Sequence, residues 1–227
     1  MNQCASPDYD CQLCPRLAGF HVANRKAYPA FYNGPVPSFG AIDAELLVVG
    51  LAPGLKGANR TGRPFTGDYA GIVLYSALQK NGFAEGNYDP EKVAGGHSDG
   101  FQLKNCRITN AVRCVPPGNK PEPFEIKQCN SFLQSEIKGM PNLKVIVSLG
   151  QISHKAIIQA LGLKQSQYKF GHGAVHKLQL ATCNLQVLNS YHTSRYNINT
   201  GALTQEMFEG VIINAKEILA YERLNVS

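Results

Sequence analysis

The stretch Glu45-Leu46-Leu47-Val48-Val49-Gly50-Leu51-Ala52, followed at once by Pro53-Gly54, decides the fold. A short, uninterrupted apolar run bounded by turn residues is typical of a strand that is buried on both faces of a parallel sheet. Three further runs share this character, and they are Cys106–Cys114, Lys144–Gly150 and Leu185–His192. The sequence therefore predicts four central parallel strands.

Helical patterns lie between and after these strands. They are expected over Ala70–Gln79, Phe124–Ile137 and Gln151–Leu161, and a last helix shows apolar residues at every fourth position from Leu203 to Leu219. Thr200 or Thr204 is the candidate N-cap of that last helix. Strand–helix alternation predicts an α/β domain with helices on both faces of the sheet. Residues 1–40 are expected to wrap the domain as an arm, and residues 84–105 to form an insertion loop.

The composition fits one folded domain. The chain has 227 residues, of which 44% are apolar and 17% charged, and this balance excludes a disordered protein. The net charge of +6 permits a polyanionic partner without requiring one. No apolar stretch is long enough to span a membrane, and the N-terminus lacks the pattern of a signal peptide. We therefore expect a cytoplasmic protein with no membrane contact.

Four cysteines form two pairs on loop-like sequence. Two residues lie between Cys11 and Cys14, in a CxxC spacing, and 14 residues lie between Cys114 and Cys129. Thiolates are soft ligands, and four of them suit either a [4Fe–4S] cluster or a tetrahedral zinc ion. The alternative is that these are ordinary thiols without a ligand.

The other three cysteines lack this spacing. An odd total of seven cannot pair completely as disulfides, and thiols stay reduced in the cytoplasm. Cys106 and Cys183 adjoin predicted strands, so we interpret them as packing residues. Cys4 is the one candidate for a substitute metal ligand.

Polar sequence follows the carboxyl end of each predicted strand. In open α/β sheets ligands bind at these ends. The rule selects four places, which are Ala52–Gly54, Asn110–Cys114, Gly150 and Tyr191–Ser194. We expect them to form one site.

The segment Gly50–Gly71 carries six glycines in 22 residues, although it has neither P-loop nor dinucleotide-site spacing. This density suggests a backbone that closely approaches a ligand. Its cations suit phosphates, and Phe65 suits stacking on a flat ring, with ordinary core packing as the alternative. Asp68 is the only carboxylate in the segment. It is either a functional group or the N-cap of the helix that follows.

A polar loop, His192–Gly201, joins the fourth strand to the last helix. A histidine at a strand end is a site arrangement, although a lone histidine is more often structural. Tyr196 suits an apolar wedge that opens a base stack, with an exposed loop tyrosine as the alternative.

Together these segments resemble the uracil-DNA glycosylase superfamily, and in particular its iron–sulfur branch called family 5 or type B. Four segments carry the resemblance, which runs from Cys11 to the last helix: Gly50–Asp68, Ile108–Cys114, Phe170–Ala174 and His192–Gly201. It implies a three-layer α/β/α fold with a central four-stranded parallel sheet. It also implies one domain over residues 1–227, with two cluster cysteines on the arm 1–40.

The resemblance further implies excision of uracil, and of some deaminated purines such as hypoxanthine and xanthine, from single- or double-stranded DNA by a monomeric, monofunctional enzyme. The implied [4Fe–4S] ligands are Cys11, Cys14, Cys114 and Cys129. The implied catalytic residues are Asp68, Asn110 and His192. The implied base-binding residues are Ala52, Gly54, Phe65, Asn110 and His192. The expected DNA-binding residues are Lys56, Arg60, Arg63, Arg195 and Tyr196.

The chain departs from the family pattern at two places. Other branches carry a polar residue for the attacking water where this chain has Leu51 and Ala52, which leaves Asp68 as the candidate. Gly54 and Thr193 replace the Ala and Pro expected of type B, and Gly54 leans towards family 4. Three rival interpretations follow: a non-catalytic module that binds damaged DNA, a zinc protein of similar fold, and a family 4-like enzyme restricted to uracil.

Overall fold

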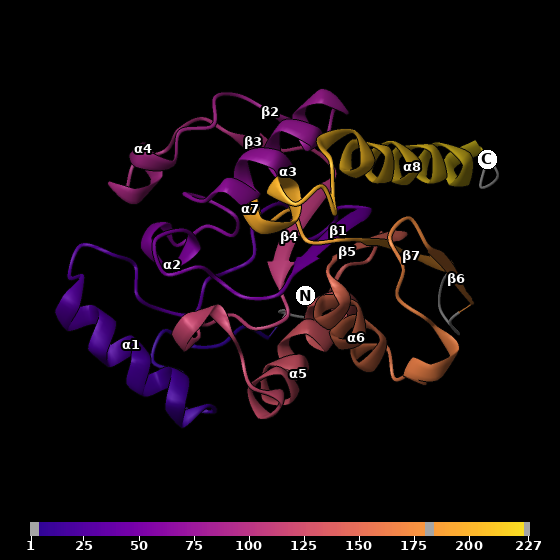
Figure 1. The fold of residues 1–227 in the computed structure, drawn as a ribbon. Helices are drawn as coiled ribbons and strands as arrows, with labels where there is room; N and C mark the ends of the chain where they lie inside the picture. Colours follow the sequence, from indigo (N-terminus) through magenta and orange to yellow (C-terminus); the bar gives the residue numbers. More distant parts are fainter. Residues whose placement is uncertain (1–4, 180–183, 225–227) are drawn as a thin grey trace.

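The computed structural model describes residues 5–179 and 184–224. One five-stranded sheet, in the order β4-β1-β5-β7-β6, lies between helices on both faces (Figure 1). Its parallel strands are β4 (Cys106–Asn110), β1 (Leu46–Gly50), β5 (Val145–Leu149) and β7 (Asn184–Ser190). The predicted α/β fold and its four central strands are confirmed.

A fifth strand, β6 (Val175–Gln179), pairs antiparallel with β7 at the edge of the sheet and was not predicted. Only Leu178 of this strand is buried, so the sequence shows no apolar run there. Edge strands commonly carry charged side chains, as β6 does at Lys177, because these discourage pairing with another chain.

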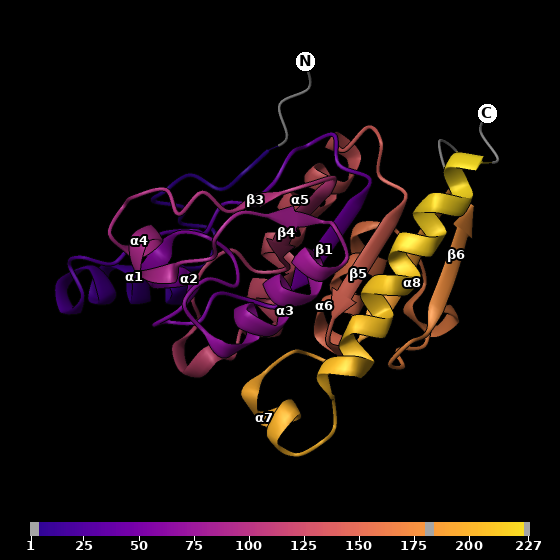
Figure 2. The same cartoon turned by 90° about the horizontal axis from the view of Figure 1, so that it is seen from above.

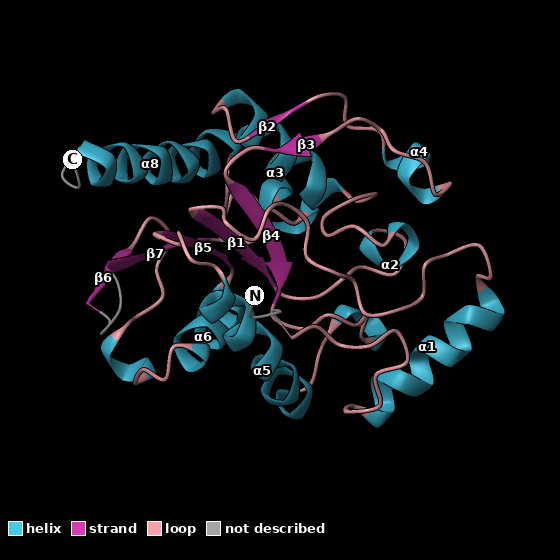
Figure 3. Ribbon diagram, turned by 180° about the vertical axis from the view of Figure 1, so that it is seen from behind, coloured by secondary structure: helices cyan, strands magenta, loops and turns pink. Residues whose placement is uncertain are grey.

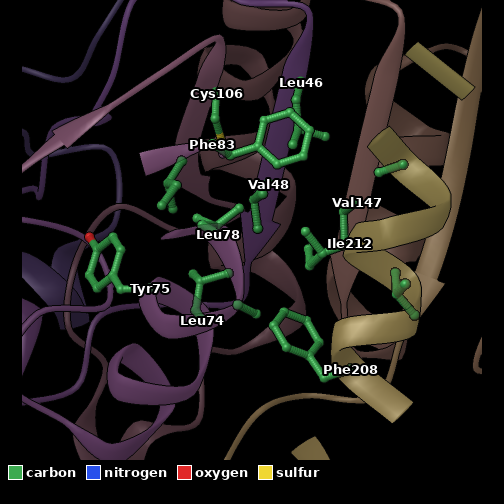
Figure 4. Packing of buried hydrophobic residues seen from close by; sticks show 14 of the residues in the cluster. Leu46, Val48, Leu74, Tyr75, Leu78, Phe83, Cys106, Val147, Phe208 and Ile212 are labelled. Atoms are coloured by element: carbon green, nitrogen blue, oxygen red, sulfur yellow. The ribbon is translucent and has the colours of Figure 1, made fainter. Parts of the chain in front are cut away.

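One face of the sheet is covered by α3 (Tyr69–Lys80) and α8 (Gln205–Leu224). Leu46 and Val48 of β1 point into this layer, where they meet side chains of both helices (Figure 4). Thr204 rather than Thr200 caps α8, because its hydroxyl accepts a hydrogen bond of 3.1 Å from the backbone N–H of Met207.

The opposite face is covered by α5 (Pro123–Gly139) and α6 (Gln151–Ala160). Leu47 and Val49 of β1 point into this second layer. Successive side chains of a strand point to opposite faces, so an unbroken apolar run supplies both layers at once. This explains why the apolar run Glu45–Ala52 predicts a strand with helices on both sides.

The arm contains a helix, α1 (Pro15–Ala27), that the sequence did not reveal. Its buried face mixes Leu17 and Ala18 with the polar His21 and Asn24, so no apolar stripe marks it. The arm then runs back along the domain, where Phe39 forms a β-bridge with Ile108.

The insertion at residues 84–105 is not a plain loop. Two short strands, β2 (Ala84–Glu85) and β3 (Gln102–Leu103), pair antiparallel and frame α4 (Pro90–Ala94) (Figure 3). The remaining short elements are α2 (Ala58–Thr61), α7 (Arg195–Asn199) and 3-10 turns at Pro117–Asn119 and Gln165–Gln167. Among the helices of the described ranges, none has the length and apolar character needed to cross a bilayer.

Candidate active site and cysteine pocket

The carboxyl ends of the central strands converge as expected. Asn110 is the last residue of β4, Gly50 is the last residue of β1, and His192 follows the end of β7. One pocket collects residues from these ends and from the glycine-rich segment, and its lining is Ala52, Pro53, Gly54, Ala58, Phe65, Asp68, Ala70, Asn110 and His192. Every residue that the sequence suggested for base binding or catalysis therefore lies around one cavity.

Phe65 forms a wall of this pocket and is only 6% exposed. Its ring lies close to parallel with the imidazole of His192, with 6.2 Å between ring centroids and 29° between planes. A Cβ on Gly50 would lie 2.5 Å from the Phe65 ring and would also collide with the amide oxygen of Asn110. Glycine at the end of β1 therefore lets both side chains reach the pocket.

Asn110 is 3% exposed, and its amide oxygen Oδ1 is buried without a hydrogen-bond partner. Leaving a buried polar group unpaired costs about 1–3 kcal/mol. Because Asn110 lines the pocket, this oxygen can accept a hydrogen bond from an N–H or O–H group of a water or ligand there.

The two carboxylate oxygens of Asp68 have different surroundings. Oδ1 accepts a hydrogen bond of 3.0 Å from the backbone N–H of Gly71, so Asp68 is the N-cap of α3. Oδ2 is turned towards the glycine-rich segment, where a Cβ on Gly57 would lie 2.7 Å from it and one on Gly54 would lie 3.5 Å from it. The second oxygen is therefore available at the pocket.

His192 is held by its neighbours along the loop. Its carbonyl accepts a hydrogen bond of 2.8 Å from Nδ2 of Asn197, and the hydroxyl of Thr193 donates one of 3.3 Å to the carbonyl of Ala70. Burial lowers the pKa of the imidazole below its ordinary value, and the charge of Asp68 opposes this shift. The ring is therefore neutral at pH 7, with one N–H to donate.

The five expected DNA-binding residues divide into two groups. Lys56, Arg195 and Tyr196 are exposed, and Tyr196 has an exposed fraction of 75%. Arg60 and Arg63 are instead bonded to carboxylates of the insertion, namely Glu91 and Asp99. The Arg63 side chain is only 11% exposed, which disagrees with the expectation that it holds a phosphate.

No sequence pattern marks the residues that bind these two arginines. Glu91 and Asp99 lie in the insertion, as does Tyr88, whose hydroxyl contacts the backbone of Gly67. Each of these contacts joins positions more than 20 residues apart. No spacing pattern marks such pairs, so only the structure reveals them.

Cys11, Cys14, Cys114 and Cys129 line one pocket, together with the apolar residues Pro7, Leu13, Leu17, Val112 and Phe132. All four are free thiols. Burial, together with the neighbouring Cys129, Glu125 and Cys11, raises the pKa of Cys14 to about 11. The two cysteine pairs are therefore close enough to act on each other.

The chemistry of this pocket fits a sulfur-ligated group. It offers four soft donors within an apolar lining, and the backbone N–H of Arg113 donates to Sγ of Cys129 at 3.3 Å. In the described part of the chain, no group of three or more His, Cys, Asp or Glu side chains is arranged to hold a metal ion. Cys106 is buried on β4, away from this pocket lining, while Cys4 and Cys183 lie outside the described residues.

Comparison with known proteins agrees with these features. The family model of the uracil DNA glycosylase superfamily matches residues 37–216. The chain is 41% identical over 213 residues to the type-5 uracil-DNA glycosylase of Thermus thermophilus, covering 92% of this chain and 93% of that protein. It is 36% identical over 220 residues to the type-5 uracil-DNA glycosylase of Mycobacterium bovis, covering 93% and 79%.

A type-4 uracil-DNA glycosylase of Pyrobaculum aerophilum is also similar, with 30% identity over 184 residues that cover 81% of this chain and 77% of that protein. The two type-5 proteins match at higher identity and over more of the chain, so the resemblance to that branch is confirmed despite Gly54. The chain belongs to the uracil-DNA glycosylase superfamily.

Proposed function

We propose that this chain is a DNA repair enzyme that hydrolyses the N-glycosidic bond of uracil in DNA and leaves an abasic site. Membership of the superfamily and the type-5 relatives support this function. The observation that carries it is the shared pocket of Phe65, Asn110 and His192, in which the Asn110 amide oxygen lacks a partner.

Base recognition uses two of these residues. The target base must leave the duplex to reach a buried pocket. The Phe65 ring offers a surface for stacking, and the Asn110 amide offers an acceptor and a donor to the Watson–Crick edge of uracil. Uracil has an N–H beside a carbonyl on that edge, so it supplies the bond that Oδ1 of Asn110 lacks.

Bond cleavage uses His192 and Asp68. As the glycosidic bond breaks, the sugar becomes positively charged and negative charge develops on the departing base. A neutral His192 donates its N–H to that base, and a well-placed donor of this kind is worth about 3 kcal/mol. Oδ2 of Asp68 accepts a hydrogen bond from the attacking water and orients it, and its negative charge also favours the cationic sugar.

The exposed residues serve DNA contact. Lys56 and Arg195 hold phosphates, and Tyr196 enters the gap that the extruded base leaves. Tyr196 and Arg195 lie on α7, which stands out from the body of the molecule (Figure 2). Arg60 and Arg63 are assigned to support of the glycine-rich segment instead, because their guanidinium groups are already paired.

Cys11, Cys14, Cys114 and Cys129 would hold a [4Fe–4S] cluster. Such a group would supply a covalent cross-link between the arm and the domain, and no part of the base chemistry. Cys11 and Cys14 would hold it at the start of α1, and Cys114 and Cys129 would hold it on the domain. Four thiols in one apolar pocket suit such a cluster, and the resemblance to the iron–sulfur branch favours it over zinc.

A duplex with one uracil tests the function. The strand is cleaved with alkali after incubation, and we expect product from the wild-type protein and none from the double variant Asn110→Ala with His192→Ala. Binding of uracil-containing DNA without product would favour the non-catalytic module. Undiminished product from the double variant would show that another site does the chemistry.

Substrate range requires a separate panel of uracil, hypoxanthine and xanthine. Gly54 adjoins Asp68, and an added Cβ there would lie 3.5 Å from Oδ2, in ordinary contact. We propose that Gly54 leaves room for larger bases. Gly54→Ala should then reduce excision of any purine in the panel more than excision of uracil, whereas an equal loss for all bases would contradict this role.

A further inference from the structure

We infer that the insertion, residues 84–105, is a brace that positions Phe65 for base stacking, and that the Tyr88 hydroxyl is its main contact. This inference rests on the proposed function. The insertion leaves the domain after α3 and returns before β4, and it reaches the glycine-rich segment at three points. Together these points hold residues 60–67, which lead directly into the pocket.

Tyr88 makes the first contact. Its hydroxyl accepts a hydrogen bond of 3.1 Å from the backbone N–H of Gly67 and lies 3.4 Å from the carbonyl oxygen of Phe65, to which it donates. Phe65 has φ of 54°, an unfavourable conformation for a residue with a Cβ, and Gly67 has φ of 92°. One hydroxyl therefore ties both ends of a tight, strained turn.

Asp99 makes the second contact, from the far side of the insertion. Its carboxylate accepts hydrogen bonds of 2.9 and 2.7 Å from Arg63, and two of 3.0 Å each from the backbone N–H groups of Asp89 and Phe101. Arg63 in turn donates from Nε to the hydroxyl of Thr66 at 2.9 Å. The carboxylate thus links the insertion to the residue that follows Phe65.

Aromatic rings enclose this second contact. The Arg63 guanidinium lies 5.0 Å from the ring centroid of Phe39 and 5.8 Å from those of Tyr75, Tyr88 and Phe101. Charge pairs are screened less by salt when they are buried. The third contact, Arg60 with Glu91, is weaker, because the Glu91 side chain is 74% exposed.

These contacts assign Tyr88 a positioning role. Tyr88 does not itself line the pocket, and it acts through the backbone of the turn that carries Phe65. If the turn at residues 65–67 were less rigid, the Phe65 ring would shift slightly from its stacking position. Small misplacements of this kind cost up to about a hundredfold in rate.

The test is Tyr88→Phe, which removes the hydroxyl but keeps the ring among its aromatic neighbours. We expect the single-turnover excision rate to fall about tenfold while the KM for uracil-containing DNA changes less than about twofold. Rates are referred to the folded fraction of each preparation, so a change in stability does not count as a result. Glu85→Gln is the matched control, because it breaks an ion pair with Lys104 inside the insertion and touches no part of the turn.

A double-mutant cycle with Phe65→Ala separates positioning from general support. If the hydroxyl acts through Phe65, Tyr88→Phe should cause little further loss in the Phe65→Ala background. Full additivity of the two losses overturns the inference, as does a Tyr88→Phe rate within about twofold of wild type. A wild-type protein that excises no uracil would instead refute the proposed function.

Discussion

The imidazole of His192 lies against the ring of Phe65 across one wall of the pocket, at 6.2 Å between centroids and 29° between planes. The two residues are far apart in the sequence, and Gly50 makes room for Phe65, because a Cβ on Gly50 would lie 2.5 Å from its ring. Stacking and hydrogen-bond donation are thus combined on one side of the cavity.

The neutral state of His192 predicts a pH profile. Burial lowers its pKa, so the imidazole becomes protonated only below the ordinary histidine value of about 6.5. We expect the single-turnover rate to stay level as the pH falls from about 8 to about 6.5, and to decline at lower pH. His192→Gln keeps an N–H donor that does not titrate, and this variant should be slower by about a hundredfold and lack that decline. A wild-type rate that already declines well above pH 6.5 would contradict this role.

Asp68→Asn separates the two functions of this side chain. Asparagine caps helices about as well as aspartate, so the free energy of unfolding should change by less than about 0.5 kcal/mol. Loss of the carboxylate should nevertheless lower the excision rate about a hundredfold, with DNA affinity retained. Asp68→Ala should lose both the rate and about 1 kcal/mol of stability. Equal rates for wild type and Asp68→Asn would reduce Asp68 to a cap.

Gly50→Ala should inactivate the protein. Its Cβ would collide with the Phe65 ring and the Asn110 amide together, and neither side chain has free space behind it in a buried site. We expect uracil excision to fall by more than about a hundredfold. Gly210→Ala on α8 is the control, because an added Cβ meets nothing within 4 Å there. Comparable activity of the two variants would show that excision does not depend on the positions of Phe65 and Asn110 in the pocket.

Iron content should depend on the cysteines of the pocket and not on Cys106, which is buried elsewhere. Cys114→Ser should purify without iron and without the broad visible absorbance of an iron–sulfur protein, since the pocket loses a ligand. Cys106→Ala should retain both, because Cys106 lies on β4 and does not line the pocket. Stoichiometric zinc in a colourless wild-type protein would exclude the cluster.

His21 predicts a pH dependence of stability. Burial lowers its pKa to about 4, and its Nε2 atom has no hydrogen-bond partner. Below about pH 6.5 His21 binds a proton in the unfolded chain but stays neutral in the folded one, so the free energy of unfolding falls as the pH falls. Between pH 7 and pH 5 His21 should lower the free energy of unfolding by about 2 kcal/mol. Urea unfolding of His21→Leu should show a smaller loss over this interval, and an identical loss would show that other groups are responsible.

Local pattern was enough for the centre of the fold. Each buried parallel strand is a short apolar run, because both of its faces meet a helical layer, and each carboxyl end shows polar residues. Those two features of the sequence are sufficient to predict that Asn110 and His192 lie at the same edge of the sheet. The edge strand β6 and the helix α1 were not predicted. Most of β6 is exposed, and the buried face of α1 includes polar side chains.

The chain alone therefore determined the α/β fold, the convergence of Asn110 and His192 at one sheet edge, and the grouping of cysteines into two pairs. Only the tertiary structure decided that Arg63 faces Asp99 rather than solvent, and that Asp68 can cap a helix with one oxygen and serve the pocket with the other. The physical reason is the separation in sequence between the residues that interact. Periodicity and spacing record which face a residue takes along its own element, whereas charge pairs and hydrogen bonds across a fold depend on where distant elements come to rest.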